Sequence, residues 1–198
     1  MKSVYTKDQL IDFEQLVHDA YEDGLIKGTI HLSKGNEEEL IKIFKRIKPN
    51  DWVFTNHRSH YHAILKSQNH RWVMEEILKG DSMHINSKKY KIFSSSIVGG
   101  CLSIAVGTAL QIKRQKKKDR VYVFIGDMAS HMGIYEEAVD YAVGHDLPIT
   151  FIIEDNEIAV YTPTEKVWGE KEGNKTELDW YVYKRGYPHH GINKWINF

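Results

Sequence analysis

Hydrophobic positions in the first fifty residues recur at helical spacing in two stretches. Thr6 and Gln9 form a T-x-x-Q capping box, apolar residues follow at intervals of three and four, and Gly24 can end this first helix. A second helix is predicted to start at Asn36, with acidic residues in its first turn, and to end at about residue 47, before a proline.

The middle of the chain mixes short apolar runs with one segment rich in small residues. We expect a short strand at 52–55 and short helices at 60–67 and 71–78. Residues 94–110 read SSSIVGGCLSIAVGTAL, in which the small side chains would let a helix approach another backbone closely. The basic run at 113–118, KRQKKK, fits a solvated helix end or loop better than a nucleic-acid patch, because no aromatic residues are interleaved.

The clearest pattern lies between residues 121 and 153. A buried strand at 121–125 is followed by a tight turn, a helix at 134–144 and a second buried strand at 149–153. This order predicts a βαβ unit, whose two strands run parallel. A further strand is expected at 180–183. The chain is therefore expected to be an α/β protein.

Composition narrows the class of protein without naming a function. The 198 residues fit one domain, 1–198, and 41% are hydrophobic, which is ordinary for a globular protein. Lys plus Arg and Asp plus Glu number 27 each, so the charge balance favours neither nucleic acid nor a membrane surface as a partner. Cys101 is the only cysteine and is interpreted as a small core residue rather than a nucleophile. With no signal-peptide core or membrane span recognised, we expect a cytoplasmic protein.

Two oxygen-bearing side chains follow the two strands of the βαβ unit. Asp127 and Asn156 come just after these strands, and parallel strands bring such ends together at one edge of a sheet, where ligands gather. Mg²⁺ prefers oxygen ligands and combines few protein groups with phosphate oxygens and water. The turn and helix start also present N–H groups to anions. The pattern indicates a Mg²⁺-diphosphate site; a helix-capping Asp127 and a turn at Asn156 are the alternative.

A longer series of motifs bears on this choice. Residues 126–133 read GDMASHMG, and Glu137-Ala138, Leu147-Pro148 and Glu154-Asp155-Asn156 follow. This series resembles the thiamine diphosphate motif, Gly-Asp-Gly to Asn-Asn, in the form found in alpha subunits of 2-oxo acid dehydrogenases of the pyruvate dehydrogenase type. Further segments resemble family motifs in the same order: GTIHLS at 28–33, DWVFTNHRSH at 51–60, SMH at 82–84 and IVG at 97–99. The resemblance covers roughly residues 7–165.

The resemblance implies thiamine diphosphate and Mg²⁺ as cofactors. Mg²⁺ would be bound by the side chains of Asp127 and Asn156 and by the backbone carbonyl of Ile158. The implied cofactor-binding residues are Arg58, Ser96, Val98, Gly126, Asp127, Met128, Ala129, Asn156 and Ile158. Among them, Arg58 would pair with the diphosphate through its charged fork. His60 and His84 match family positions near the cofactor and are the catalytic candidates.

The resemblance also implies a fold, a partner and a reaction. The fold would be a three-layer arrangement with a mostly parallel central sheet flanked by helices, extended by an unmatched C-terminal segment, 168–198. In this family the pyrimidine-binding domain belongs to a separate beta subunit, so an α2β2 complex is expected. The reaction would cleave or form a C–C bond next to the carbonyl of a 2-oxo acid or ketose. A split transketolase-like subunit and a non-catalytic truncated binding partner are the alternatives, and the substrate is left open.

Several residues depart from the family pattern. Met128 stands where the family has the second glycine of Gly-Asp-Gly, which raises a question about the geometry of the turn. Asp155 replaces an asparagine, His57 a tyrosine, and serines at 94–96 replace glycines.

The chain also has eleven histidines, most of which are interpreted as surface or structural residues. His31 and His131 are considered as further active-site candidates. The sequence Pro188-His189-His190-Gly191 could supply a substrate-facing histidine or form an exposed turn. One cysteine and no paired histidine spacing on a clear helix argue against a zinc site.

Overall fold

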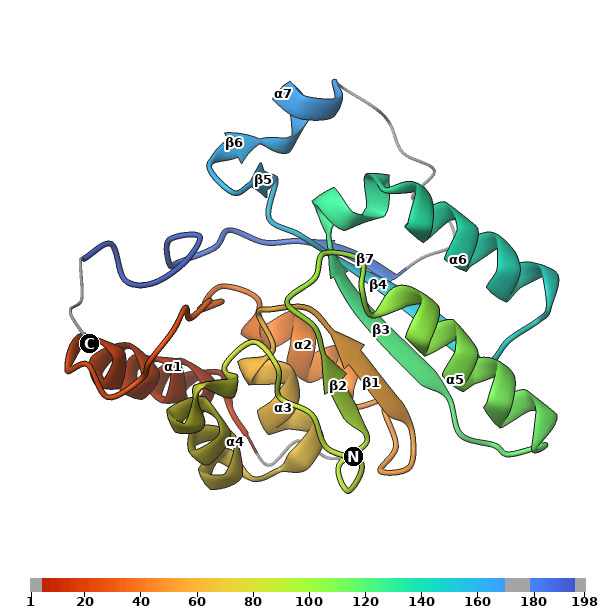
Figure 1. Cartoon of the computed structure of the whole chain (residues 1–198), viewed down its shortest axis with the longest axis horizontal. Helices are drawn as coiled ribbons and strands as arrows, with labels where there is room; N and C mark the ends of the chain where they lie inside the picture. Colours follow the sequence, from red (N-terminus) through yellow and green to blue (C-terminus); the bar gives the residue numbers. More distant parts are fainter. Residues whose placement is uncertain (1–4, 170–178, 195–198) are drawn as a thin grey trace.

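The structure is a computed structural model that describes residues 5–169 and 179–194. The centre of this described part is a five-stranded sheet in the order β2-β1-β3-β4-β7 (Figure 1). The strands are β1 (Trp52–Thr55), β2 (Ile92–Ser94), β3 (Val121–Gly126), β4 (Ile149–Asp155) and β7 (Asp179–Val182). All four pairings are parallel, so the carboxyl ends of the strands meet at one edge of the sheet.

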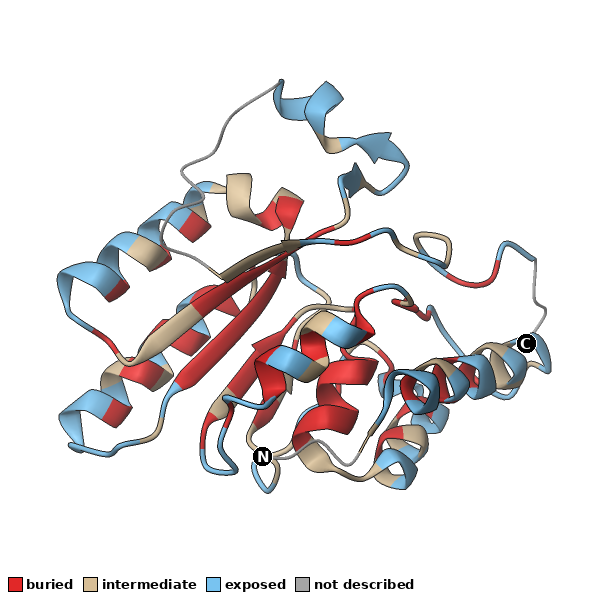
Figure 2. Cartoon of the chain, turned by 180° about the vertical axis from the view of Figure 1, so that it is seen from behind, coloured by how far each residue is buried: buried red, intermediate tan, exposed pale blue. Residues whose placement is uncertain are grey.

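Helices cover both faces of the sheet, which confirms the expected three-layer fold (Figure 1). One face carries α1 (Lys7–Glu22), α2 (Glu37–Phe44), α3 (His60–Ser67) and α4 (His70–Glu76). The other face carries α5 (Leu102–Arg114) and α6 (Gly133–Gly144). Buried strands lie between the two helical layers, as Figure 2 shows.

Strand β3 shows how one apolar run serves two cores. Val121, Val123 and Ile125 pack in the core beneath α5 and α6, whereas Tyr122 and Phe124 pack in the core on the opposite face. Because successive side chains point to opposite faces of a strand, a strand buried on both sides must be apolar at every position. The predicted βαβ unit of β3, α6 and β4 is confirmed.

The helix ends follow the local sequence, with one deviation. The capping box of α1 is present: the Gln9 amide donates to the Thr6 hydroxyl at 3.3 Å, and the Thr6 amide donates to the Gln9 side chain at 3.0 Å. Helix α2 ends at Phe44, before the predicted residue 47. The amides of Arg46 and Ile47 bond to carbonyls three residues back, so the last turn tightens ahead of the proline. Helix α4 is followed by a π-helical turn, η1 (Ile77–Asp81).

The small-residue stretch 94–110 is helical only in its second part. Residues 92–94 form strand β2, and α5 begins only at Leu102. Between them the chain turns at Gly99, which has φ +73°, and at Gly100, where a Cβ would lie 2.9 Å from that of Ile97. The small residues therefore serve a tight turn rather than helix packing in this stretch. The turn leaves Ile97 and Val98 exposed.

The C-terminal part holds small elements that the hydrophobic pattern did not predict. A hairpin of β5 (Ile158–Ala159) and β6 (Thr162–Pro163) leads into the short helix α7 (Thr164–Trp168). After β7, residues 183–194 run back over the α1 side of the molecule (Figure 1). The predicted strand at 180–183 is found one residue earlier. Within the described ranges, every helix is too short or too polar to cross a membrane.

Candidate functional site

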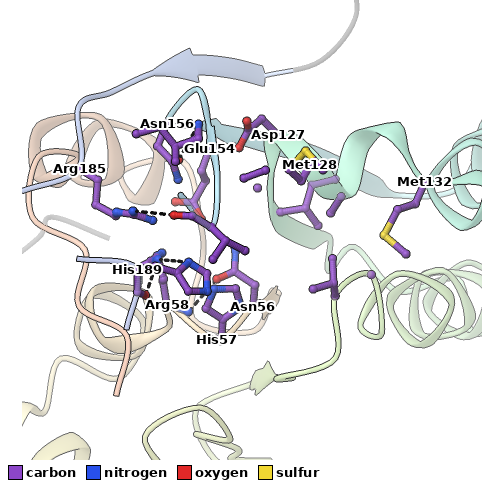
Figure 3. A pocket seen from close by; sticks show the side chains of 18 of the residues that line it. Asn56, His57, Arg58, Asp127, Met128, Met132, Glu154, Asn156, Arg185 and His189 are labelled. Atoms are coloured by element: carbon purple, nitrogen blue, oxygen red, sulfur yellow. Dashed lines mark hydrogen bonds between the residues drawn. The ribbon is translucent and has the colours of Figure 1, made fainter. Parts of the chain in front are cut away.

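A cavity of about 300 Å³ opens where β1, β3 and β4 end. It is lined by residues 56–58 after β1, residues 126–129 after β3, and Glu154 and Asn156 at the end of β4. Residues 97–99 and the segments on both sides of β7 complete the wall (Figure 3). This is the edge at which parallel sheets bind ligands, and the sequence predicted it.

Asp127 lines this cavity with 4% of its surface exposed. One carboxylate oxygen accepts a hydrogen bond from the Thr164 hydroxyl. Burial raises the pKa of Asp127, the Thr164 hydrogen bond opposes that rise, and the nearby Asp155 adds to it. Gly126 pairs with Glu154 in the sheet, so Asp127 and Asp155 stand level on adjacent strands. A buried carboxylate beside a second one is a suitable environment for a divalent cation.

Asn156 forms the turn that was considered as the alternative to a metal ligand. Its side-chain oxygen accepts a hydrogen bond from the Ile158 amide at 3.2 Å, and its side-chain nitrogen donates to the Tyr183 hydroxyl at 3.5 Å. The amide oxygen keeps a second lone pair. Both Asn156 and Ile158 line the cavity, so the turn holds the asparagine there. Their role as metal ligands stays a prediction.

Met128 fits the turn without strain. It lies in a short 3-10 helix, η2 (Asp127–His131), and is not among the described residues with positive φ. The Ser130 hydroxyl donates to the Asp127 carbonyl at 2.6 Å and closes this helical turn. Methionine therefore fits the geometry of this turn, because the backbone there does not need the positive φ that only glycine adopts freely.

Arg58 lines the cavity but is tied to backbone carbonyls. Its two terminal nitrogens donate to the carbonyl of Leu32 at 2.6 Å and to the carbonyl of His189 at 2.8 Å. Burial lowers the pKa of the guanidinium to about 10, so the group stays charged at neutral pH. Its predicted contact with a diphosphate is not tested by these bonds.

Glu154 is a site residue that sequence reasoning missed. It is 4% exposed, and its carboxylate accepts hydrogen bonds from Tyr181, at 2.6 Å, and from the side chains of Asn36 and Asn56, at 3.3 and 3.5 Å. The Nε2 atom of His62 lies 3.1 Å from it. The signal available in the sequence was an acidic residue near the end of an otherwise apolar strand. Glu154 lines the cavity, and this network holds its carboxylate in place there.

The remaining predicted site residues lie at different depths. Val98 lines the cavity. Ser96 lies outside the lining, with its hydroxyl 2.8 Å from Nε2 of the exposed His84. His60 is fully buried, with its Nε2 2.9 Å from the Ser82 hydroxyl, and also lies outside the lining. The catalytic roles of His60 and His84 stay predictions. Cys101 lines the cavity and is 3% exposed, and burial raises the pKa of its thiol to about 11.

Residues from the C-terminal third reach the cavity from far along the chain. Arg185 and His189 line it, and His131 stacks on Trp168 with ring centroids 5.1 Å apart. The Trp168 ring nitrogen donates to the Met128 sulfur at 3.1 Å. Of these residues, His131 and His189 were candidates from the sequence, whereas Arg185 and Trp168 carried no local motif.

Two of the known proteins to which this chain is similar are alpha subunits. It is 32% identical over 163 residues to the alpha subunit of acetoin:2,6-dichlorophenolindophenol oxidoreductase from Bacillus subtilis, covering 77% of this chain and 49% of that one. It is 32% identical over 168 residues to the pyruvate dehydrogenase E1 component subunit alpha from Rickettsia prowazekii, covering 79% and 52%.

A solved thiamin diphosphate-dependent enzyme, described as putative, from Mycobacterium smegmatis is similar at 16% identity and a TM-score of 0.45, covering 64% of this chain and 23% of that one. The chain spans about half the length of the curated relatives it matches. The model of the dehydrogenase E1 component family matches residues 5–175, and the chain therefore belongs to that family.

Proposed function

We propose that this chain is the diphosphate-binding part of an alpha-type subunit in a thiamine diphosphate- and Mg²⁺-dependent enzyme. The enzyme would break or form a C–C bond next to a carbonyl, together with a beta-type subunit in an α2β2 complex. The observation that carries the proposal is that Asp127 and Asn156, from adjacent strand ends, line one cavity.

The residues present fit the proposed cofactor. A carboxylate, a carboxamide oxygen and the backbone carbonyl of Ile158 are oxygen ligands of the kind that Mg²⁺ takes, with room left for phosphate oxygens. The backbone of residues 126–129 lines the cavity, and a Cβ at Gly126 would meet nothing within 4 Å. A diphosphate can therefore approach this turn closely, with the N–H groups of η2 beside it.

The residues of this chain would bind and orient the cofactor. Thiamine diphosphate, when bound, supplies the electron sink for breaking a bond next to a carbonyl. Asp127 and Asn156 would hold the metal, and Arg58 would face the diphosphate. Ile97 and Val98, which are exposed in this chain, would exclude water from the cavity once the second subunit covers them. The relatives are named for acetoin and pyruvate. A small 2-oxo acid or hydroxyketone is therefore the proposed substrate class.

An apolar rim around the cavity supports the proposed second subunit. Among the residues that line the cavity, Ile97 is 72% exposed, Val98 and Val160 are each 50% exposed, and Trp168 is 41% exposed. Large apolar side chains gathered at the mouth of a pocket mark a surface that another protein covers. Native mass spectrometry of the protein taken from its own cell extract tests this. A complex with a second chain supports the proposal, and a chain that stays alone with or without cofactor contradicts it.

The metal assignment is tested by Asp127→Asn in the full chain with its partner. Removing the carboxylate should weaken Mg²⁺-dependent binding of thiamine diphosphate at least tenfold, since a charged ligand is lost (about 1.5–3 kcal/mol). Isothermal titration calorimetry with and without Mg²⁺ measures this. Asp140→Asn is the matched control, because Asp140 is exposed on α6 outside the cavity lining. Equal affinity for thiamine diphosphate in the Asp127→Asn variant and the wild type would contradict the assignment of Asp127 as a metal ligand.

A further inference from the structure

A buried glutamate of α1 holds the backbone of a loop beside the cavity. Glu14 is 0% exposed, and both of its carboxylate oxygens accept a hydrogen bond from the Ser33 amide at 2.9 Å. The Lys34 amide donates to the same carboxylate at 3.1 Å. Burial without such partners would be costly, because it penalises the charged form of a carboxyl group. The hydrogen bonds offset part of this cost, and the other side of the loop shows what the carboxylate can contribute.

The carbonyl side of the same loop holds Arg58. One terminal nitrogen of the guanidinium donates to the Leu32 carbonyl at 2.6 Å, and the other donates to the His189 carbonyl at 2.8 Å. The Leu32 carbonyl and the Ser33 amide belong to one peptide group. The described peptide bonds are all trans, so the N–H and the C=O of this group point in opposite directions. Glu14 and Arg58 therefore bind the two ends of a single planar group.

This shared peptide group couples the two charged side chains through a chain of hydrogen bonds. The carboxylate polarises the N–H, which makes the carbonyl oxygen a better acceptor for the guanidinium, and both bonds are stronger in a buried environment than in water. Burial raises the pKa of Glu14 to about 8, and the hydrogen bond from the Ser33 amide and the charge of Arg58 are among the causes that oppose this rise. Removing the carboxylate should therefore weaken the hydrogen bond that orients Arg58.

We propose that Glu14 is a positioning residue, which acts through the peptide group between Leu32 and Ser33 to hold the Arg58 guanidinium at the wall of the cavity. Arg58 lines the cavity, whereas Glu14 does not. This inference rests on the proposed function, in which Arg58 faces a diphosphate. A guanidinium binds phosphate oxygens through a fixed fork of donors, so its orientation affects the affinity. Glu14 thus contributes to cofactor binding without touching the cofactor.

The substitution Glu14→Gln tests this proposal in the full chain. It keeps the length of the side chain, removes the charge and replaces one acceptor oxygen by an NH₂ group. Calorimetry with sodium pyrophosphate plus Mg²⁺ at pH 9, above the pKa of Glu14, should show binding weakened about tenfold, as expected when a charged hydrogen bond is weakened. In an Arg58→Gln background the same substitution should cause no further loss, because its effect passes through the guanidinium.

Asp51→Asn is the matched control. Asp51 is 1% exposed and accepts hydrogen bonds from the amides of Lys48 and Arg120, at 2.7 and 2.8 Å, so this variant also removes a buried carboxylate from backbone donors. Asp51 precedes β1, at the edge of the sheet opposite the cavity, and does not line the cavity. The control should lower the free energy of unfolding in urea and leave the affinity for pyrophosphate unchanged. A purely structural role for Glu14 would give this same pattern in Glu14→Gln.

The position of Arg58 is followed directly by carbon-detected NMR of its guanidinium carbon, whose signal is assigned by its absence in Arg58→Gln. Glu14→Gln should shift or broaden this signal, and Asp51→Asn should leave it unchanged. Glu14→Asp is measured beside them, because it keeps the charge but shortens the side chain by one methylene group. It should move the same signal even if Glu14→Gln does not fold.

Three results would overturn the proposal: unchanged pyrophosphate affinity in Glu14→Gln, an equal further loss in the Arg58→Gln background, or an Arg58 signal that stays in place in both Glu14 variants. If the wild-type chain binds no pyrophosphate, the proposed function fails, and the Arg58 signal alone decides whether Glu14 positions the arginine. If Asp127→Asn abolishes Mg²⁺-dependent binding of thiamine diphosphate while Glu14→Gln changes nothing, the proposed function stands and this inference fails.

Discussion

Substituting alanine for Gly35 should loosen residues 183–192, the segment after β7 that we call the strap. Backbone hydrogen bonds from Tyr183, Gly186 and Gly191 hold this segment to the rest of the molecule. Gly35 has φ +120°, and a Cβ there would lie 2.2 Å from the carbonyl oxygen of Lys184 in the strap. Real Cβ atoms do not approach a backbone oxygen so closely, so one of the two segments must move. Alanine at a positive φ is also less stable than glycine, by about 1–2 kcal/mol.

Gly28→Ala separates these two effects. Gly28 also has a positive φ, +103°, but a Cβ there would meet nothing within 4 Å. The control therefore carries the cost of backbone conformation alone. The difference between the variants reports the strap contacts near Gly35, chiefly the bonds from Gly186 to Lys34 and from Arg58 to His189. Losing one neutral and one charged hydrogen bond predicts about 2–4 kcal/mol beyond the control.

Urea unfolding of the two variants and the wild type measures this difference as a change in the free energy of unfolding. Titration of the same samples with pyrophosphate and Mg²⁺ should show weaker binding in Gly35→Ala only, because the His189 carbonyl of the strap holds Arg58, the arginine proposed to face the diphosphate. Equal destabilisation of Gly28→Ala and Gly35→Ala would refute the reasoning, since it would mean that the strap contributes nothing at this contact.

Two further predictions concern pH. Thr164→Val removes the hydroxyl that donates a hydrogen bond to Asp127 and opposes the rise in the pKa of Asp127. The pKa of Asp127 should therefore rise further in this variant. When binding of Mg²⁺-pyrophosphate is followed from pH 7 down to pH 4, the variant should lose binding at a higher pH than the wild type. His60 has a folded-state pKa of about 4, below its ordinary value of 6.5, because it is buried. The unfolded chain therefore binds more protons below pH 6.5, and stability should fall by about 1.4 kcal/mol per pH unit on this account as the pH drops from 6.5 towards 4. His60→Gln should reduce that slope in urea unfolding series, and an unchanged slope would contradict the assignment.

The sequence could predict the βαβ unit and the edge at which the cavity forms, because the signals there are local. The apolar runs of β3 and β4, the turn after Gly126 and the helix between them lie within one stretch of chain. The parallel topology then places Asp127 and Asn156 in the lining of one cavity. The capping box of α1 could be predicted in the same way, since all its groups lie within four residues.

The elements that were missed depend on contacts between distant segments. Strand β2 has only three residues, and its pairing with β1 cannot be inferred from so short a run. The hairpin of β5 and β6 and the helix α7 are largely exposed, so hydrophobic periodicity carries no information about them. Arg185 belongs to no motif and reaches the cavity only because the strap folds back. Glu154 belongs to the Glu154-Asp155-Asn156 motif, but only its partners in space identify it as a site residue.

The position of Arg58 joins the predicted half of the site to the half that the sequence did not reveal. The arginine lies in a family-like segment after β1, yet one of its two terminal donors is held by the His189 carbonyl of the strap. Without the strap that donor would turn to water or to a ligand, and the guanidinium would be free to leave its present orientation. The strap therefore sets the direction of the arginine that is expected to face the diphosphate. It follows that a strap variant should alter cofactor affinity even if the strap itself never touches the cofactor.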